Sequence, residues 1–111
     1  MNWIPLQEET QLDQIIEDSN VSPQVIFKHS TRCSVSSMAK NRLDKNAGLE
    51  GVNFYFLDLI KFRNLSNKIA DHFGVRHQSP QVLIINHGKC IYDESHSGIT
   101  MDEIEVITMQ S

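Results

Sequence analysis

The stretch FKHSTRCSVSSMAK, residues 27–40, joins the end of an apolar run to the start of a helical pattern. The run QVIFKH, residues 24–29, is rich in β-branched and aromatic residues and predicts a strand. The serine and threonine that follow can cap a helix over residues 34–45. The sequence therefore predicts a strand-to-helix junction, with Cys33 at the start of the helix.

The rest of the chain also alternates between helical and strand patterns. An amphipathic pattern predicts a helix over residues 8–19, on which Trp3 is expected to pack. After the junction, the patterns predict a strand at 52–59, a helix at 62–73, strands at 80–86 and 89–94 joined by a tight turn, and a helix at 100–110 with a Thr100–Glu103 capping box. This order predicts an α/β fold in one domain, residues 1–111, with a mixed four-stranded sheet flanked by about four helices.

Composition excludes several classes of partner. The net charge is −4 and the ten Lys and Arg residues are scattered, which argues against nucleic acid because phosphate binding requires a basic stripe. No apolar run approaches the roughly 18 residues of a membrane span. The N-terminal stretch has no basic flank or apolar core, so we expect a cytoplasmic protein. The histidines lack zinc-site spacing, and no metal is expected.

Two segments carry a resemblance to a known family. The element order, with a cysteine at the first strand-to-helix junction, is similar to the thioredoxin fold. The segment FGVRHQSPQVLIINHGK, residues 73–89, resembles the thioredoxin segment that passes through a cis-proline into the third strand. RCSVSSMA and HQSPQVLIINHGK together more narrowly resemble the monothiol bacilliredoxins, thioredoxin-like proteins of the bacillithiol system whose motif lacks the second cysteine. The resemblance covers nearly the whole chain.

The resemblance implies roles for individual residues. Cys33 would be the nucleophile, Pro80 would be the cis-proline facing it, and the backbone of Ser79 would pair with a substrate strand. The buried acid of many thioredoxins is replaced by Phe27, and the tryptophan common before the nucleophile is replaced by Arg32. Both departures point away from a dithiol disulfide reductase.

The chemistry expected of Cys33 follows from its position. A thiolate attacks disulfides, and the partial positive charge of a helix N-terminus favours the thiolate, as would neighbouring Arg32. Without a nearby second cysteine, a monothiol mechanism remains, in which Cys33 takes a small thiol from a target protein and a second thiol or a reductase then clears it. The resemblance implies that this co-substrate is bacillithiol, that the partners are S-bacillithiolated cytosolic proteins, and that no cofactor is bound. A buried structural cysteine is the alternative interpretation.

Other residues are candidates for substrate binding. Ser36 lies one helical turn beyond Cys33, where its hydroxyl can bond the sulfur or merely fill space. His77, with Arg32 and Lys28, can contact an acidic small thiol, although each is also typical of a solvated loop or edge. Cys90 is expected on the order of 20 Å from Cys33, because a six-residue strand separates them.

Two other functions stay open at this point. The R-C-x-x-S pattern also occurs in monothiol glutaredoxins, which use glutathione and can hold an iron–sulfur cluster. Against this, Gln78-Ser79 replaces their threonine-valine before the cis-proline, and their double glycine is missing. The second alternative is a non-catalytic thioredoxin-fold stress or binding protein. A monomer is expected, because it suits a monothiol exchange enzyme.

Overall fold

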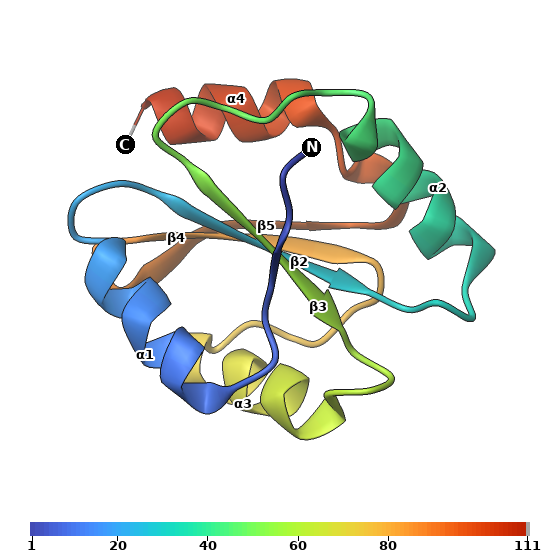
Figure 1. Ribbon diagram of the computed structural model, residues 1–111, viewed down its shortest axis with the longest axis horizontal. Coiled ribbons are helices and arrows are strands. Elements are labelled where there is room, and N and C mark those ends of the chain that lie inside the picture. The colour runs from blue at the N-terminus through green and yellow to red at the C-terminus, as the bar shows by residue number, and fades with distance from the viewer. Residues whose placement is uncertain (111) are drawn as a thin grey trace.

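A five-stranded mixed sheet forms the centre of the computed structural model, which describes residues 1–110 (Figure 1). Its strands are β1 (Ile4–Pro5), β2 (Gln24–His29), β3 (Asn53–Asp58), β4 (Gln81–Asn86) and β5 (Lys89–Ser95). Their spatial order is β1-β3-β2-β4-β5, with β3 parallel to β1 and β2, and β4 antiparallel to β2 and β5. Ser111, the last residue of the predicted domain, lies outside the described residues.

The predicted four-stranded sheet was wrong by one short edge strand. Ile4 and Pro5 pair in parallel with Tyr55 and Phe56 of β3. Two residues are too short to show an alternating pattern, and a proline argues against a central strand while being tolerated at an edge. The pairing of β1 depends on the position of β3, and no local sequence pattern near the N-terminus indicates that position.

Four α-helices cover the two faces of the sheet (Figure 1). Helices α1 (Glu9–Asp18) and α3 (Arg63–Phe73) lie on one face, and α2 (Ser34–Asp44) and α4 (Met101–Met109) lie on the other. Each begins and ends within one or two residues of its predicted range. A short 3-10 helix, η1 (His96–Gly98), precedes α4 and was not predicted. In residues 1–110, no helix has the length and apolar character needed to cross a bilayer.

Alternation along the strands sorts side chains into two buried clusters. Ile26 of β2 points toward α1 and α3, whereas Val25 and Phe27 point toward α2 and α4. Trp3 follows the same rule, because it lies on the opposite side of the sheet from Ile4. The predicted packing of Trp3 on the first helix is therefore wrong: its ring stacks on Phe27, with centroids 5.6 Å apart, on the α2 side.

The cap of α4 gives a modest stability prediction. The Thr100 Oγ1 accepts a hydrogen bond from the Glu103 amide at 3.3 Å, which is one half of the predicted capping box. Replacing Thr100 with alanine leaves this helix amide without its partner, so the free energy of unfolding should fall by about 0.5–1 kcal/mol. Urea denaturation measures the change, and Thr100→Ser should retain the cap. Equal midpoints for the wild type and the alanine variant would contradict the prediction.

Candidate active site

Cys33 lies at the junction between β2 and α2, as the N-cap residue of the helix. Its backbone is extended, with φ −114° and ψ 118°. Its amide donates to the Ser30 carbonyl at 3.2 Å, and its carbonyl accepts from the Ser37 amide at 3.1 Å. Within residues 1–110 the sulfur makes no capping hydrogen bond, and the residue is half-buried. The sulfur therefore lies at the N-terminus of α2 without a capping hydrogen bond, where unpaired backbone N–H groups leave a partial positive charge.

The Ser36 hydroxyl lies behind the junction and does not bond the Cys33 sulfur. Its Oγ accepts a hydrogen bond from the Ser30 amide at 3.0 Å and lies 2.7 Å from His29 Nδ1. Ser36 is completely buried, so it is also unavailable for direct contact with a substrate. Of the two alternatives for Ser36, the bond to the sulfur is wrong, and the hydroxyl does more than fill space, because it closes the loop that joins β2 to α2.

His29, the last residue of β2, belongs to this junction but was not among the site residues predicted from the sequence. It is buried, and its ring lies 5.9 Å from that of Phe27 and 5.3 Å from that of Phe56. Burial, and secondarily the Lys40 ammonium, lowers the pKa of His29 from its ordinary value. Its place in the strand could have indicated this environment, because His29 lies two residues beyond Phe27 and therefore on the same face of the sheet.

The loop before β4 brings Ser79 and Pro80 to the same edge of the sheet. The Ser79–Pro80 peptide bond is cis, which confirms the cis-proline implied by the resemblance. In the β2–β4 register Gln81 lies opposite Lys28, so Pro80 lies near the end of β2, where the Cys33 junction begins. Pro80 is buried, and the Ser79 Oγ is a buried atom without a hydrogen-bond partner in the described residues. The fold therefore gathers the predicted nucleophile and this loop at one edge.

Lys28, which is buried, lies beside the half-buried His77 on the α3 side of the sheet. The Lys28 ammonium is completely buried, donates to the Ser66 carbonyl at 3.0 Å and lies 3.4 Å from His77 Nδ1. Burial lowers the pKa of Lys28 to about 8. Burial, then the Lys28 and Arg63 charges, lowers the pKa of His77. Lys28 therefore cannot contact an acidic thiol directly, because it is enclosed and its partners are a backbone carbonyl and an imidazole.

Arg32 and Cys90 occupy contrasting environments. Arg32 is exposed in the turn that precedes Cys33. Cys90 pairs with Ile85, which in turn lies opposite Gln24 at the far end of β2 from the Cys33 junction. Its thiol donates to the Tyr92 carbonyl at 3.3 Å, and burial raises the pKa of Cys90. The predicted separation of the two cysteines is confirmed, because β2 spans about 17 Å.

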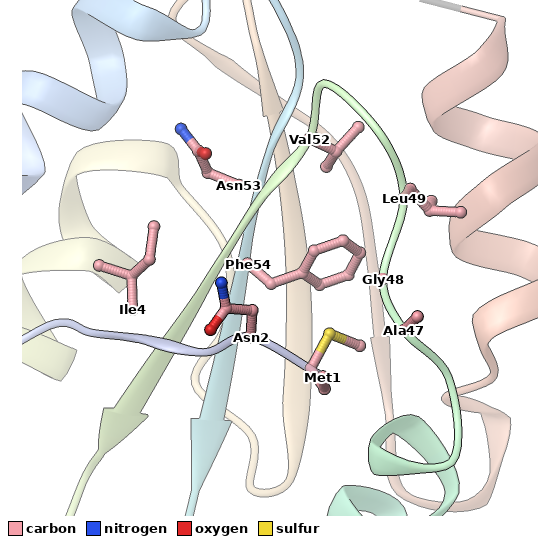
Figure 2. Close-up of a pocket in the computed structure, with 9 residues that line it drawn as sticks. All are labelled: Met1, Asn2, Ile4, Ala47, Gly48, Leu49, Val52, Asn53 and Phe54. Carbon is pink, nitrogen blue, oxygen red and sulfur yellow. The ribbon is translucent and has the colours of Figure 1, made fainter.

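A partly open cavity lies at the opposite edge of the sheet, at the start of β3. There, Met1 and Phe54 point toward the backbone of Gly48 and line a cavity of about 260 Å³ (Figure 2). Asn53 begins β3 at this cavity, whereas Asp58 ends it opposite His29. The cavity is therefore remote from Cys33. Among the described residues, no three His, Cys, Asp or Glu side chains gather closely enough to hold a metal ion.

Known proteins resemble this chain in both sequence and structure. The family model described as monothiol bacilliredoxin BrxC matches residues 4–104. A candidate oxidoreductase with a thioredoxin fold is 27% identical, with a TM-score of 0.81 over 93% of this chain and 90% of that one. Thioredoxin from Malassezia sympodialis is 14% identical, with a TM-score of 0.75 over 98% and 90% of the two chains. Thioredoxin from Trypanosoma brucei brucei is 15% identical, with a TM-score of 0.77 over 98% and 91%.

The fold and the junction agree with these resemblances. The thioredoxins, at their low identity, support the thioredoxin fold alone. One cysteine, Cys33, caps the N-terminus of α2, and the first turn of the helix contains no second one. The family match extends over nearly the whole chain, from the edge strand to the last helix. The chain therefore belongs to the monothiol bacilliredoxin family and is a thiol oxidoreductase with a thioredoxin fold.

Proposed function

We propose that this oxidoreductase removes bacillithiol from mixed disulfides on cytosolic proteins, with Cys33 as the nucleophile. The observation that carries the proposal is the half-buried Cys33 sulfur, free of capping bonds at the N-terminus of α2, with Ser36 in place of a second cysteine. Membership of the monothiol bacilliredoxin family supports bacillithiol as the small thiol. We also propose that the enzyme is a monomer and binds no cofactor.

The exchange proceeds in two displacements. The Cys33 thiolate attacks the bacillithiol sulfur of the mixed disulfide, and the target protein leaves as a thiolate that takes up a proton from water. Cys33 then carries bacillithiol through a new disulfide bond. A second thiol, from another bacillithiol molecule or a reductase, attacks the bacillithiol sulfur of this adduct and releases the Cys33 thiolate. The electrons that reduce the target protein therefore come from the second thiol.

The surroundings of Cys33 suit a small anionic thiol attached to a protein. Arg32 supplies an exposed cation beside the nucleophile, and bacillithiol-like thiols carry carboxylates. Val35 and Met38, 41% and 61% exposed on α2, offer an apolar surface to the target protein. The backbone of Ser79, before Pro80, can pair with an extended segment of the target. The half-buried ring of His77 contributes to binding of the anionic thiol. Ser36 and Lys28 are buried beneath this surface and do not contact the substrate.

Intact-mass spectrometry tests the proposal. Reduced protein is mixed with bacillithiol disulfide, with glutathione disulfide, or with a target protein that bears a bacillithiol adduct. A mass gain of one bacillithiol on Cys33, release of the reduced target, and the same result in Cys90→Ser support the proposal. Equal or faster reaction with glutathione would instead indicate a glutaredoxin-like enzyme. The absence of an adduct from every donor would contradict catalysis and leave a non-catalytic binding protein.

A further inference from the structure

Lys28 is a buried cation whose neighbours include no carboxylate. Its ammonium donates to the Ser66 carbonyl at 3.0 Å and lies 3.4 Å from His77 Nδ1. Among residues 1–110, no Asp or Glu forms an ion pair with it. A charge enclosed away from water acts strongly on the groups beside it. Ser66 is buried and His77 is half-buried, so His77 is the neighbour through which this charge meets the surface.

The contact between Lys28 and His77 assigns the tautomer of the imidazole. An ammonium group has hydrogens to donate and no acceptor, so Nδ1 must be unprotonated to bond it. The Ser66 Oγ, also 3.4 Å from Nδ1, has a hydrogen to donate to the same nitrogen. Burial, then the Lys28 and Arg63 charges, lowers the pKa of His77 and keeps the ring neutral at pH 7. The single ring hydrogen therefore lies on Nε2, which points away from Lys28.

His77 lines an open cleft between the end of α3 and the loop before β4. The cleft has a volume of about 620 Å³, and its other ionisable lining residues are Arg76 and Asp71, both exposed. The charges of Arg76 and Asp71 offset each other, so the enclosed charge of Lys28 leaves the balance positive. The Arg76 carbonyl accepts from Gln81 Nε2 at 2.9 Å, which ties the loop to β4. A hydrogen-bond donor backed by a positive charge suits a carboxylate.

We propose that this cleft binds a carboxylate of the small thiol: His77 donates its Nε2–H to the carboxylate, and Lys28 is a positioning residue that holds the tautomer and supplies the counter-charge. This rests on the proposed function in that the small thiol is brought to Cys33. His77 precedes Pro80 by three residues, a span of at most about 11 Å. The cleft therefore lies close to the loop that accompanies Cys33 at the edge of the sheet.

A pair of disulfide donors tests the proposal. All proteins carry Cys90→Ser, and intact-mass spectrometry gives the rate of adduct formation on Cys33 with bacillithiol disulfide and with the uncharged 2-hydroxyethyl disulfide. Lys28→Met should lower the rate constant with bacillithiol disulfide by about tenfold and leave that with the uncharged donor unchanged. The matched control, Lys89→Met, replaces an exposed lysine at the start of β5 and should leave both rate constants unchanged.

Variants of His77 test whether Lys28 acts through the ring. His77→Phe should also lower the rate constant with bacillithiol disulfide by about tenfold, and adding Lys28→Met should cause little further loss. His77→Gln has an amide that can accept from Lys28 and donate to a carboxylate, so it should retain most of the wild-type rate. Full additivity of the Lys28 and His77 variants would contradict action through the ring.

Long-range ¹H–¹⁵N spectra of the wild-type protein give a test that needs no variant. They should show His77 protonated on Nε2 at pH 7, and a ring protonated on Nδ1 would overturn the proposal. A loss in Lys28→Met shared by both donors, or no loss with bacillithiol disulfide, would also overturn it while leaving Cys33 as the nucleophile. The absence of a wild-type adduct from any donor would instead contradict the proposed function, and this site with it.

Discussion

Cys33→Ser is expected to lower the rate of bacillithiol removal from a target protein by at least about 1,000-fold, to the level of uncatalysed exchange. Serine retains the size and cap position of the residue, so the β2–α2 junction should fold as before. It lacks a group that ionises to an effective nucleophile at neutral pH, and no second thiol lies near the N-terminus of α2. The rate is measured by the loss of adduct mass from the target in a single turnover.

Cys90→Ser is the matched control for this result. Cys90 lies on β5 beside Ile85, at the far end of the sheet from Cys33, and its sulfur is engaged with the Tyr92 carbonyl. The variant should therefore retain the wild-type rate. A residual rate in Cys33→Ser that disappears when Cys90 is also replaced would show that Cys90 is the nucleophile instead.

Lys28→Met is expected to raise the free energy of unfolding at pH 7 by about 1–2 kcal/mol. The Lys28 ammonium is completely buried, and its partners are the Ser66 carbonyl and the His77 ring, neither of which is an anion. Methionine fills a similar volume without a charge to desolvate. The lost hydrogen bonds offset part of the gain. Urea denaturation at pH 7 measures the difference, and a less stable variant would contradict the prediction.

The pH dependence of the free energy of unfolding tests independently whether burial of Lys28 is the cause. Burial lowers the pKa of Lys28 from 10.5 to about 8, so between these values the unfolded chain binds a proton that the folded protein lacks. Stability due to Lys28 therefore rises with pH across this window, by about 1–3 kcal/mol in total. The advantage of Lys28→Met over the wild type should shrink from pH 8 to 10.5. Tyr55 and Tyr92 also titrate at alkaline pH, but equally in both proteins.

An exposed lysine provides the control for the buried one. Lys89, at the start of β5, is solvated. Lys89→Met should change the free energy of unfolding at pH 7 by no more than about 0.5 kcal/mol. If both lysine variants behave alike, burial of Lys28 is not the cause of the effect.

Local patterns were sufficient for most of the fold and for the centre of the site. Residues 24–29 and 34–44 carry the strand and helix periodicities that place Cys33 at their junction, because side-chain spacing over a few residues reports which face is buried. Pro80 could be identified because the segment around it, residues 73–89, resembles the corresponding thioredoxin segment. These features depend on neighbours in the chain, which is why they could be predicted.

Contacts between distant segments decided the rest. β1 exists because Ile4 and Pro5 meet β3, some fifty residues away in the sequence. Ser36 bonds His29 and the Ser30 amide rather than the sulfur, and Lys28 is enclosed by α3, because packing of helices on the sheet determines which polar groups meet. A buried polar group bonds whichever partner packing brings within reach. Spacing along the chain predicted which residues are near Cys33, and packing determined where their hydrogen bonds go.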